Sequence, residues 1–340
     1  MQMPSEHAPV RSALTRRSLL TGGGAAAAAV ALAACSGGSG GSGGGSASGK
    51  PLVIVGCYGV QYMAQQVCGD RAEVVSTARP GQEPHDVELS LADTAKIQKA
   101  DVIIQIPGFQ PALDDVISSK GLSSKVLDVS KTVTLIPASQ SESGTVELGG
   151  SDGGGEHDHE HDHGHDHEHG EFDPHFWNDP VLLGTVATEL GKRLGAAKPD
   201  QKSAFADAAK KTADALGALA EEMTKKFEAV KEPRVFVTGH TAFAYLAKRF
   251  HLEQVGIAGV DPENEPSPQR LLALQKLIRD KKVSTVFFEE SASPKVAETL
   301  AKNVGVKSDS LDNCETQLDP KKDYPAVMRE NTTKLLASWR

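Results

Sequence analysis

One long, uninterrupted helical pattern constrains the architecture of this chain most. Between residues 199 and 230, only Gly217 weakens a helix. Mostly apolar residues recur there at steps of three or four, as on one face of a helix: Phe205, Ala209, Thr212, Leu216, Leu219, Met223, Phe227 and Val230. A helix of this length would be about 48 Å long. Because the pattern lacks the strict heptad of a coiled coil, we interpret it as a strut between two lobes.

Short apolar strands alternate with helices on both sides of this segment. Before it we expect strands at 52–55, 73–77, 102–106 and 125–129, and helices at 58–67, 91–100, 111–118 and 179–194. After it we expect strands at 234–238, 283–288 and 304–307, and helices at 242–250, 269–281, 295–303 and 324–339. Such alternation predicts an α/β fold of two α/β lobes, each with a mostly parallel sheet, joined by one long helix. The lobes are expected at 50–198 and 231–340.

The N-terminus has the pattern of an export signal. Arginines that include Arg16 and Arg17 precede an Ala-rich run, which is shorter than a membrane-spanning helix. The arginine pair resembles a twin-arginine signal, and an ordinary Sec signal is the alternative. Leu32-Ala33-Ala34-Cys35 resembles a bacterial lipobox, which implies cleavage after residue 34 and a lipid on Cys35. Residues 35–49 would then be a Gly/Ser tether that holds the protein at the extracytoplasmic face of the membrane.

Charge and cysteine content narrow the class of partner. Removal of residues 1–34 takes away three arginines and one glutamate, so the formal net charge moves from −9 to −11. An acidic body disfavours nucleic acid and anionic membrane surfaces, and it suits a cation. Cys57, Cys68 and Cys314 remain, and no disulfide pair can be assigned because the first two would flank a helix on the order of 16 Å long. Buried small side chains are the simpler interpretation.

A histidine tract occupies residues 156–170. Its histidines alternate with acids, and the tract contains nothing apolar that could form a core: His157, His159, His161, His163, His165, His167 and His169. We expect an unstructured insertion over 144–170 that offers many weak, exchangeable metal sites. It would gather or buffer zinc, and the alternative is a spacer without a metal role.

Four further histidines lie in the body of the chain. We expect His85 in the loop after the second strand, His175 just before a helix, and His240 in a strand-to-helix turn, where α/β sheets bind ligands. His251 is expected at a helix end, where a packing or capping role is the better interpretation. Three imidazoles and a carboxylate suit zinc. Spacing alone leaves open whether the first three meet or are unrelated loop residues.

Four motifs follow one another in the body of the chain: Gln82-Glu83-Pro84-His85-Asp86, Asp173-Pro174-His175-Phe176-Trp177, Gly239-His240-Thr241-Ala242-Phe243-Ala244-Tyr245-Leu246 and Glu265-Pro266-Ser267-Pro268. In this order they resemble the motifs of the zinc/manganese ABC-transporter solute-binding lipoproteins. The resemblance covers residues 50–340 and implies two lobes joined by a single long helix, with the metal in the cleft between them. It implies His85, His175 and His240 as ligands, with Asp309 as the fourth. The family usually has Asp-Pro-Leu where this chain has Asp309-Ser310-Leu311. Glu289 and Glu290 are therefore alternatives for the fourth ligand. The simpler interpretation of these two acids is that they are solvated residues at the end of a strand.

The expected function is a lipid-anchored, monomeric zinc receptor that delivers its ion to an ABC permease in the membrane. His240 favours zinc because manganese carriers of this kind usually have a carboxylate there. The alternatives are an exported zinc buffer or chaperone dominated by the tract, a manganese receptor, and a zinc hydrolase. Outside the histidine tract the sequence contains no H-E-x-x-H motif, and an enzyme would have only Glu83 or Glu289 as a base.

Overall fold

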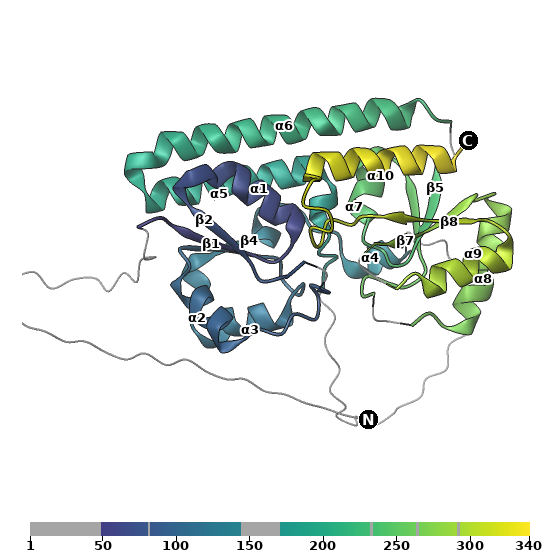
Figure 1. Ribbon diagram of the computed structural model, residues 1–340, viewed down its shortest axis with the longest axis horizontal. Coiled ribbons are helices and arrows are strands. Elements are labelled where there is room, and N and C mark those ends of the chain that lie inside the picture. Colours follow the sequence, from purple (N-terminus) through teal and green to yellow (C-terminus); the bar gives the residue numbers. More distant parts are fainter. Residues whose placement is uncertain (1–48, 81, 144–170, 232–233, 263–264, 291–292) are drawn as a thin grey trace, which may run out of the picture. The chain divides into compact units, whose positions relative to one another are not determined.

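Two four-stranded parallel sheets form the framework of the protein (Figure 1). The computed structural model describes residues 49–80, 82–143, 171–231, 234–262, 265–290 and 293–340. The first sheet has the order β2-β1-β3-β4 and consists of β1 Leu52–Val55, β2 Glu73–Ser76, β3 Val102–Gln105 and β4 Val126–Asp128. The second has the order β6-β5-β7-β8 and consists of β5 Val235–Thr238, β6 Glu253–Gly256, β7 Thr285–Glu289 and β8 Lys307–Leu311.

The helices connect these strands as the alternation predicts. They are α1 Tyr58–Cys68, α2 Leu91–Lys99, α3 Pro111–Ser119, α4 Ala138–Ser143, α5 Pro180–Ala197, α6 Lys202–Glu228, α7 Ala244–Phe250, α8 Pro268–Asp280, α9 Lys295–Val304 and α10 Tyr324–Ser338. Capping residues in the sequence fix where several of these helices begin. Ser90 forms a capping box with Asp93 at α2, and the Asp179 carboxylate accepts from backbone amides at the start of α5.

The two sheets share one connectivity. In each, the first strand pairs on one side with the second and on the other with the third, and all pairs are parallel. The central strands β1 and β5 are buried along their whole length, because helices cover both faces of each sheet. We call the regions around the first and second sheet the N-terminal and C-terminal lobes. The predicted α/β fold with two lobes is confirmed, while the lobe boundaries at 50–198 and 231–340 stay a prediction.

The long helix α6 links the lobes, as predicted. It packs against α1 and α5 toward its beginning and against α7 and α10 toward its end (Figure 1). Its predicted stripe is buried from Phe205 to Phe227. Contact with α5 is very close: a Cβ at Gly191 would lie 2.5 Å from the Cβ of Ala209. Glycine at this position therefore allows the two helices to pack as one layer.

One hydrophobic core runs through both lobes. A single cluster contains β1 residues such as Val53, the buried face of α6, and C-terminal residues such as Phe236 and Phe287. Each sheet has a smaller, separate core on its other face. Both sheets belong to one compact unit, Gly44–Arg340. Lobes that share a core in this way are held together by burial of apolar surface as well as by the chain connection.

Two elements and one strand boundary differ from the sequence prediction. Strand β6 and helix α4 were not predicted. The last strand was expected at 304–307, and it runs over Lys307–Leu311. Cys57, Cys68 and Cys314 are buried and free, which confirms their interpretation as small packed side chains. The described residues contain no helix long and apolar enough to cross a bilayer. The expected signal, Cys35, the tether up to residue 48 and the histidine tract lie outside the described residues.

Candidate metal centre

Four side chains from distant parts of the chain converge on one point: His85, His175, His240 and Glu315. Their donor atoms all lie within 4.8 Å of one another. The Nε2 atoms of His85 and His175 are 3.3 Å apart. Glu315 Oε1 lies 3.2 Å from His175 Nε2, 3.6 Å from His240 Nε2 and 3.7 Å from His85 Nε2. We call this set the four-donor cluster.

These separations match the edges of a small coordination polyhedron. Zinc binds imidazole nitrogen at about 2.0–2.1 Å and carboxylate oxygen at a similar distance. Donors at the corners of a tetrahedron of that radius lie roughly 3.3 Å apart. The four-donor cluster therefore has the composition and the spacing that a single zinc ion requires.

His85 lies in the loop between β2 and α2 and is the most accessible member of the cluster. Its side chain is 14% exposed, whereas the other three are 2% exposed or less. Its backbone amide donates to Glu83 Oε1 at 3.2 Å, and its ring stands edge-on to Phe109 at 4.7 Å between centroids. Burial lowers the pKa of His85, which favours the neutral imidazole that a metal binds.

His175 is held by a carboxylate from its own loop. It precedes a short 3₁₀ turn, Phe176–Asn178, at the start of α5. Asp173 Oδ1 accepts from the His175 backbone amide at 2.9 Å and from Nδ1 at 2.8 Å. The Nδ1 proton is thereby fixed, and Nε2 points to the cluster. Burial opposes protonation, but Asp173 and Glu315 raise the pKa of His175 above its ordinary value.

The segment around His175 is also fastened to the C-terminal lobe. Trp177 Nε1 donates to the carbonyl of Asn313 at 2.8 Å, and Tyr324 Oη donates to the carbonyl of Trp177 at 2.6 Å. Asn178 Nδ2 donates to the carbonyl of Ala242 at 2.9 Å. All of these groups are buried. His175 therefore projects from a segment whose position both lobes fix.

His240 follows β5, the strand at which the order of the second sheet reverses. Such switch points are the usual ligand sites of open α/β sheets. Glu289, at the end of neighbouring β7, accepts from the His240 backbone amide at 3.1 Å, and the same oxygen lies 3.3 Å from Nδ1. A Cβ at Gly239 would lie 2.2 Å from Glu289 Oε2, so glycine there admits the carboxylate. Burial opposes protonation, but Glu289 and Glu315 raise the pKa of His240 well above its ordinary value.

Glu315 lies in the loop after β8 and is completely buried. Its carbonyl accepts from the amide of Tyr58 at 2.8 Å, and the carbonyl of Cys314 accepts from Gly59 at 2.9 Å. These amides belong to the first turn of α1, where a helix has no internal acceptors for them. Burial alone would raise the pKa of Glu315, but the three histidines lower it well below its ordinary value.

Several donor atoms in the cluster lack hydrogen bonds. Among the described residues, neither ring nitrogen of His240 and neither carboxylate oxygen of Glu315 has a hydrogen-bond partner, although all are buried. The contacts of Glu315 with the imidazoles are short but are not aligned as hydrogen bonds. Buried polar groups without partners are costly, and a bound cation would satisfy those that face the cluster.

The structure brings three of the predicted residues together and leaves the fourth elsewhere. Asp309 is exposed within β8, so we correct the assignment of the fourth donor from Asp309 to Glu315. The error came from matching Asp309-Ser310-Leu311 to the family's Asp-Pro-Leu, whereas β8 continues through these residues to Leu311. Glu315 could have been found by the rule that site residues follow the carboxyl ends of parallel strands.

The two substitute acids also lie outside the cluster. Glu289 faces Nδ1 of His240, on the side of the ring away from Glu315. Glu290 is exposed and accepts from Ser310 Oγ at 2.8 Å and Lys334 Nζ at 3.2 Å. His251 ends α7 with a left-handed backbone, φ 54°, and is exposed, in agreement with the predicted helix-end role.

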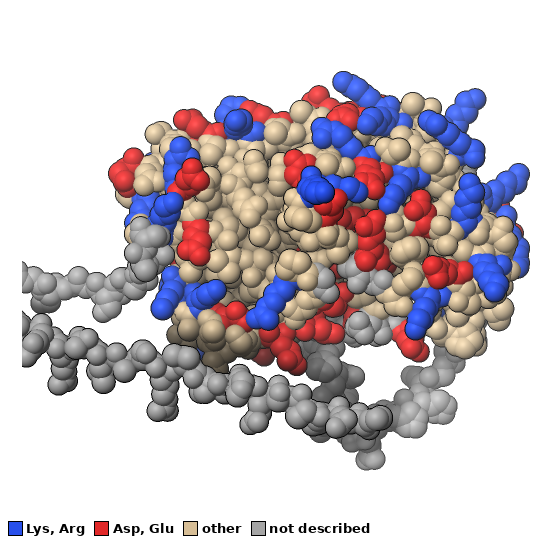
Figure 2. Space-filling model, viewed as in Figure 1, with Lys and Arg blue, Asp and Glu red and all other residues tan. Residues whose placement is uncertain are grey.

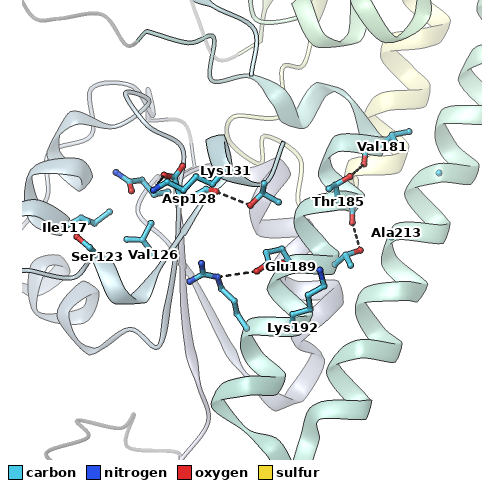
Figure 3. A pocket seen from close by; sticks show the side chains of 16 residues that line it. Ile117, Ser123, Val126, Asp128, Lys131, Val181, Thr185, Glu189, Lys192 and Ala213 are labelled. Atoms are coloured by element: carbon cyan, nitrogen blue, oxygen red, sulfur yellow. Dashed lines mark hydrogen bonds and ion pairs between the residues drawn. The ribbon is translucent and has the colours of Figure 1, made fainter. Parts of the chain in front are cut away.

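The structure also contains a cavity that none of the four donor residues lines (Figure 3). It has a volume of about 830 Å³ and lies between β4 with its following turn and the exposed face of α5. Its charged side chains pair with one another: Lys131 with Asp128 at 3.0 Å and Lys192 with Glu189 at 3.4 Å. None of the four donors lines it. Its size therefore does not indicate the functional site.

Comparison with known proteins agrees with the fold. Residues 53–338 match the family described as zinc-uptake complex component A, periplasmic. The zinc-binding lipoprotein AdcA of Streptococcus pneumoniae is 34% identical over 297 residues, which cover 85% of this chain and 56% of AdcA. The high-affinity zinc uptake system protein ZnuA of Bacillus subtilis is 31% identical over 296 residues, which cover 85% of this chain and 88% of ZnuA. The chain thus spans little more than half the length of AdcA.

Solved structures show the same architecture. The laminin-binding protein Lmb of Streptococcus agalactiae, described as a bifunctional protein with adhesin and metal transporting activity, superposes with a TM-score of 0.69 at 31% identity. That match covers 85% of this chain and 100% of Lmb. Zn(II)-bound AdcA from Streptococcus pneumoniae gives a TM-score of 0.67 at 29% identity, covering 86% of this chain and 58% of that one. The chain therefore belongs to the family of the periplasmic component A of zinc-uptake complexes.

Proposed function

We propose that this protein is a high-affinity zinc receptor that binds one zinc ion through the four-donor cluster on the extracytoplasmic side of the membrane. It would deliver that ion to the permease of an ABC metal-uptake system. The observation that carries the proposal is a buried centre in which one carboxylate oxygen of Glu315 lies 3.2–3.7 Å from three imidazole nitrogens, with all four donors within 4.8 Å of one another. The zinc-binding and zinc-uptake names of the relatives support the same cargo.

The donor set favours zinc over manganese. Zinc accepts four nitrogen and oxygen donors in a tetrahedron, whereas manganese prefers more oxygen donors and a larger coordination number. The cluster supplies three nitrogens and one carboxylate, and no other described residue joins the group of donors that lie within 4.8 Å of one another. Glu289, the nearest additional acid to His240, is engaged on the opposite side of the ring.

The cluster suits binding rather than catalysis. A catalytic zinc keeps one coordination position open for water or substrate and needs a base beside it. Four converging side chains would fill a tetrahedron, and three of them are at most 2% exposed. We therefore propose a receptor that performs no chemistry on its cargo.

The surface charge supports a cation as cargo. The chain has a formal net charge of −9. Figure 2 shows acidic side chains gathered in the centre and at the lower margin of the face drawn, and basic side chains most frequent around the far end of α6 and over α8 and α9. A local negative potential raises the concentration of cations within about a Debye length, roughly 10 Å at 0.1 M salt.

We further propose a lipid anchor at Cys35, with residues 36–49 as its tether. The lipobox pattern supports it, and a relative is named a zinc-binding lipoprotein. The histidine tract would gather zinc weakly and in several copies, beside one tight site.

The test is metal content and affinity in matched histidine variants. The full chain without residues 1–34 is purified and stripped of metal, with residues 156–170 present or deleted. Chelator competition should find one tight zinc in both forms and additional weak zinc only with the tract present. His175→Ala should weaken the tight site roughly 10²–10³-fold, about one quarter of the free energy of a four-donor zinc site.

His251→Asn is the matched control because His251 is exposed, lies outside the cluster and has a backbone conformation that asparagine tolerates. It should bind zinc like the unaltered protein. A tight site that disappears when the tract is deleted, or that survives His175→Ala unchanged, would refute the proposed receptor site.

A further inference from the structure

The inserted segment that carries the histidine tract leaves and re-enters the fold at one place. Helix α4 precedes the insertion, and residues 171–173 follow it. Pro137 and Phe172 form an antiparallel bridge, and the Ala138 amide donates to the carbonyl of Glu171 at 3.1 Å. The Asp173 amide donates to the carbonyl of Ile136 at 2.8 Å. These contacts join residues 136–143, which include α4, to residues 171–173, and we call these two segments the stem.

Within the stem, Ser141 reaches the metal centre indirectly, through the carboxylate of Asp173. Ser141 lies on α4, is 7% exposed, and donates from Oγ to Asp173 Oδ2 at 2.6 Å. The other oxygen of Asp173 binds the amide and Nδ1 of His175. Both oxygens of this fully buried carboxylate are therefore occupied, one by Ser141 and one by His175 of the four-donor cluster.

The backbone of Asp173 is fixed as well. Tyr245 Oη, from the C-terminal lobe, donates to the carbonyl of Asp173 at 2.7 Å and accepts from the Ile136 amide at 2.8 Å. With the backbone held, the remaining freedom is rotation of the carboxylate about its terminal torsion, which has a broad energy profile. Among the described residues, the Ser141 hydroxyl is the group that hydrogen-bonds Oδ2, and this hydrogen bond favours one orientation of the Asp173 carboxylate.

We infer that Ser141 is a positioning residue for zinc binding: it orients the Asp173 carboxylate, which in turn orients the His175 ring. This inference rests on the proposed function, since it assigns Ser141 a role only if His175 binds zinc. It also makes the stem of the inserted segment part of the support of the metal centre. Outer partners of metal-bound histidines are known to influence affinity through ring orientation and basicity.

The test compares Ser141→Ala with Ser139→Ala. Ser139 lies on the same helix but is exposed, so its variant controls for loss of a serine hydroxyl from α4. Ser141→Ala should weaken zinc roughly three- to tenfold, less than loss of a direct outer partner, and Ser139→Ala should leave the affinity unchanged. With cobalt(II) as the probe, Ser141→Ala should shift the visible absorption bands, which report ligand orientation.

A double-mutant cycle with Asp173→Asn separates positioning from general destabilisation. If Ser141 acts through Asp173, Ser141→Ala should cause little further loss in the Asp173→Asn background. Two results would overturn the inference: equal losses of zinc affinity in both backgrounds, or a zinc affinity and a cobalt spectrum that Ser141→Ala leaves unchanged. Tight zinc binding by the unaltered protein would still leave the proposed function intact. Absence of a tight zinc site in the unaltered protein would instead refute the proposed function itself.

Discussion

His175 and His240 both have a buried carboxylate beside Nδ1, but the two carboxylates come from different distances along the chain. Asp173 is two residues before His175 and hydrogen-bonds both the backbone amide and the ring. Glu289 comes from a neighbouring strand, 49 residues after His240, and hydrogen-bonds only the backbone amide, while its oxygen lies 3.3 Å from the ring nitrogen. The local support fixes a ring directly, whereas the long-range support depends on the pairing of β5 with β7.

The sharpest test of this difference is to neutralise each carboxylate. Asp173→Asn should weaken zinc toward the upper end of the roughly 10–100-fold range that outer-shell changes cause, and Glu289→Gln toward its lower end. The reason is that the Asp173 contact with Nδ1 is an aligned hydrogen bond and the Glu289 contact is not. Chelator competition at fixed pH measures both. A larger loss for Glu289→Gln would reverse the comparison.

Zinc affinity should also fall with decreasing pH. The pKa values of His175 and His240 are raised in the metal-free protein, so zinc must displace protons that neighbouring carboxylates stabilise. Below those pKa values the affinity should fall roughly tenfold per pH unit for each proton displaced. Glu289→Gln should flatten the profile by lowering the pKa of His240. Titrations at several pH values measure the slope, and a slope identical in the variant would contradict the assigned cause.

The same shifts determine how the stability of the metal-free protein depends on pH. A raised histidine pKa stabilises the folded state fully below the ordinary 6.5 and loses that effect as pH rises through the folded value. The lowered pKa of Glu315 stabilises the fold above the ordinary 4.5, and the effect is lost as pH falls through the folded value. Zinc should therefore raise the melting temperature more at about pH 8 than at about pH 6.

The smallest predicted effect concerns the glycine that admits Glu289. In Gly239→Ala the new Cβ would displace the Glu289 carboxylate, which is the end of a flexible side chain, so the fold should survive while zinc weakens roughly three- to tenfold. Gly217→Ala is the matched control, since a Cβ there meets nothing within 4 Å and a helical alanine stabilises by about 0.5–1 kcal/mol. Equal zinc affinity in both variants would remove Glu289 from the support of His240.

The sequence was sufficient where the governing contacts are local or periodic. The stripe of α6 follows from helical periodicity, and the α/β lobes follow from strand–helix alternation. Asp173 lies two residues from His175, within one motif, and the motif was recognised even though the role of its aspartate was not assigned.

The remainder depends on pairing between distant segments. Glu289 was singled out as a strand-end acid, but its place beside Nδ1 of His240 follows from sheet order, which no local pattern encodes. Glu315 was missed because the resemblance was matched to Asp309, which lies within β8. That strand carries mostly polar, exposed residues, which give little apolar signal for where it ends. Helix α4 and Ser141 were missed because a segment of six residues without a periodic apolar face does not indicate a helix.

The hydrogen bonds from the Tyr58 and Gly59 amides to the loop that carries Glu315 help to place the Glu315 carboxylate in the four-donor cluster. Glu315 follows the second sheet in sequence, yet its backbone rests on the opening turn of a helix from the first half of the molecule. A fragment containing only the second half would carry the glutamate without the surface that aims it. The complete four-donor cluster therefore requires the two halves of the molecule to be packed together.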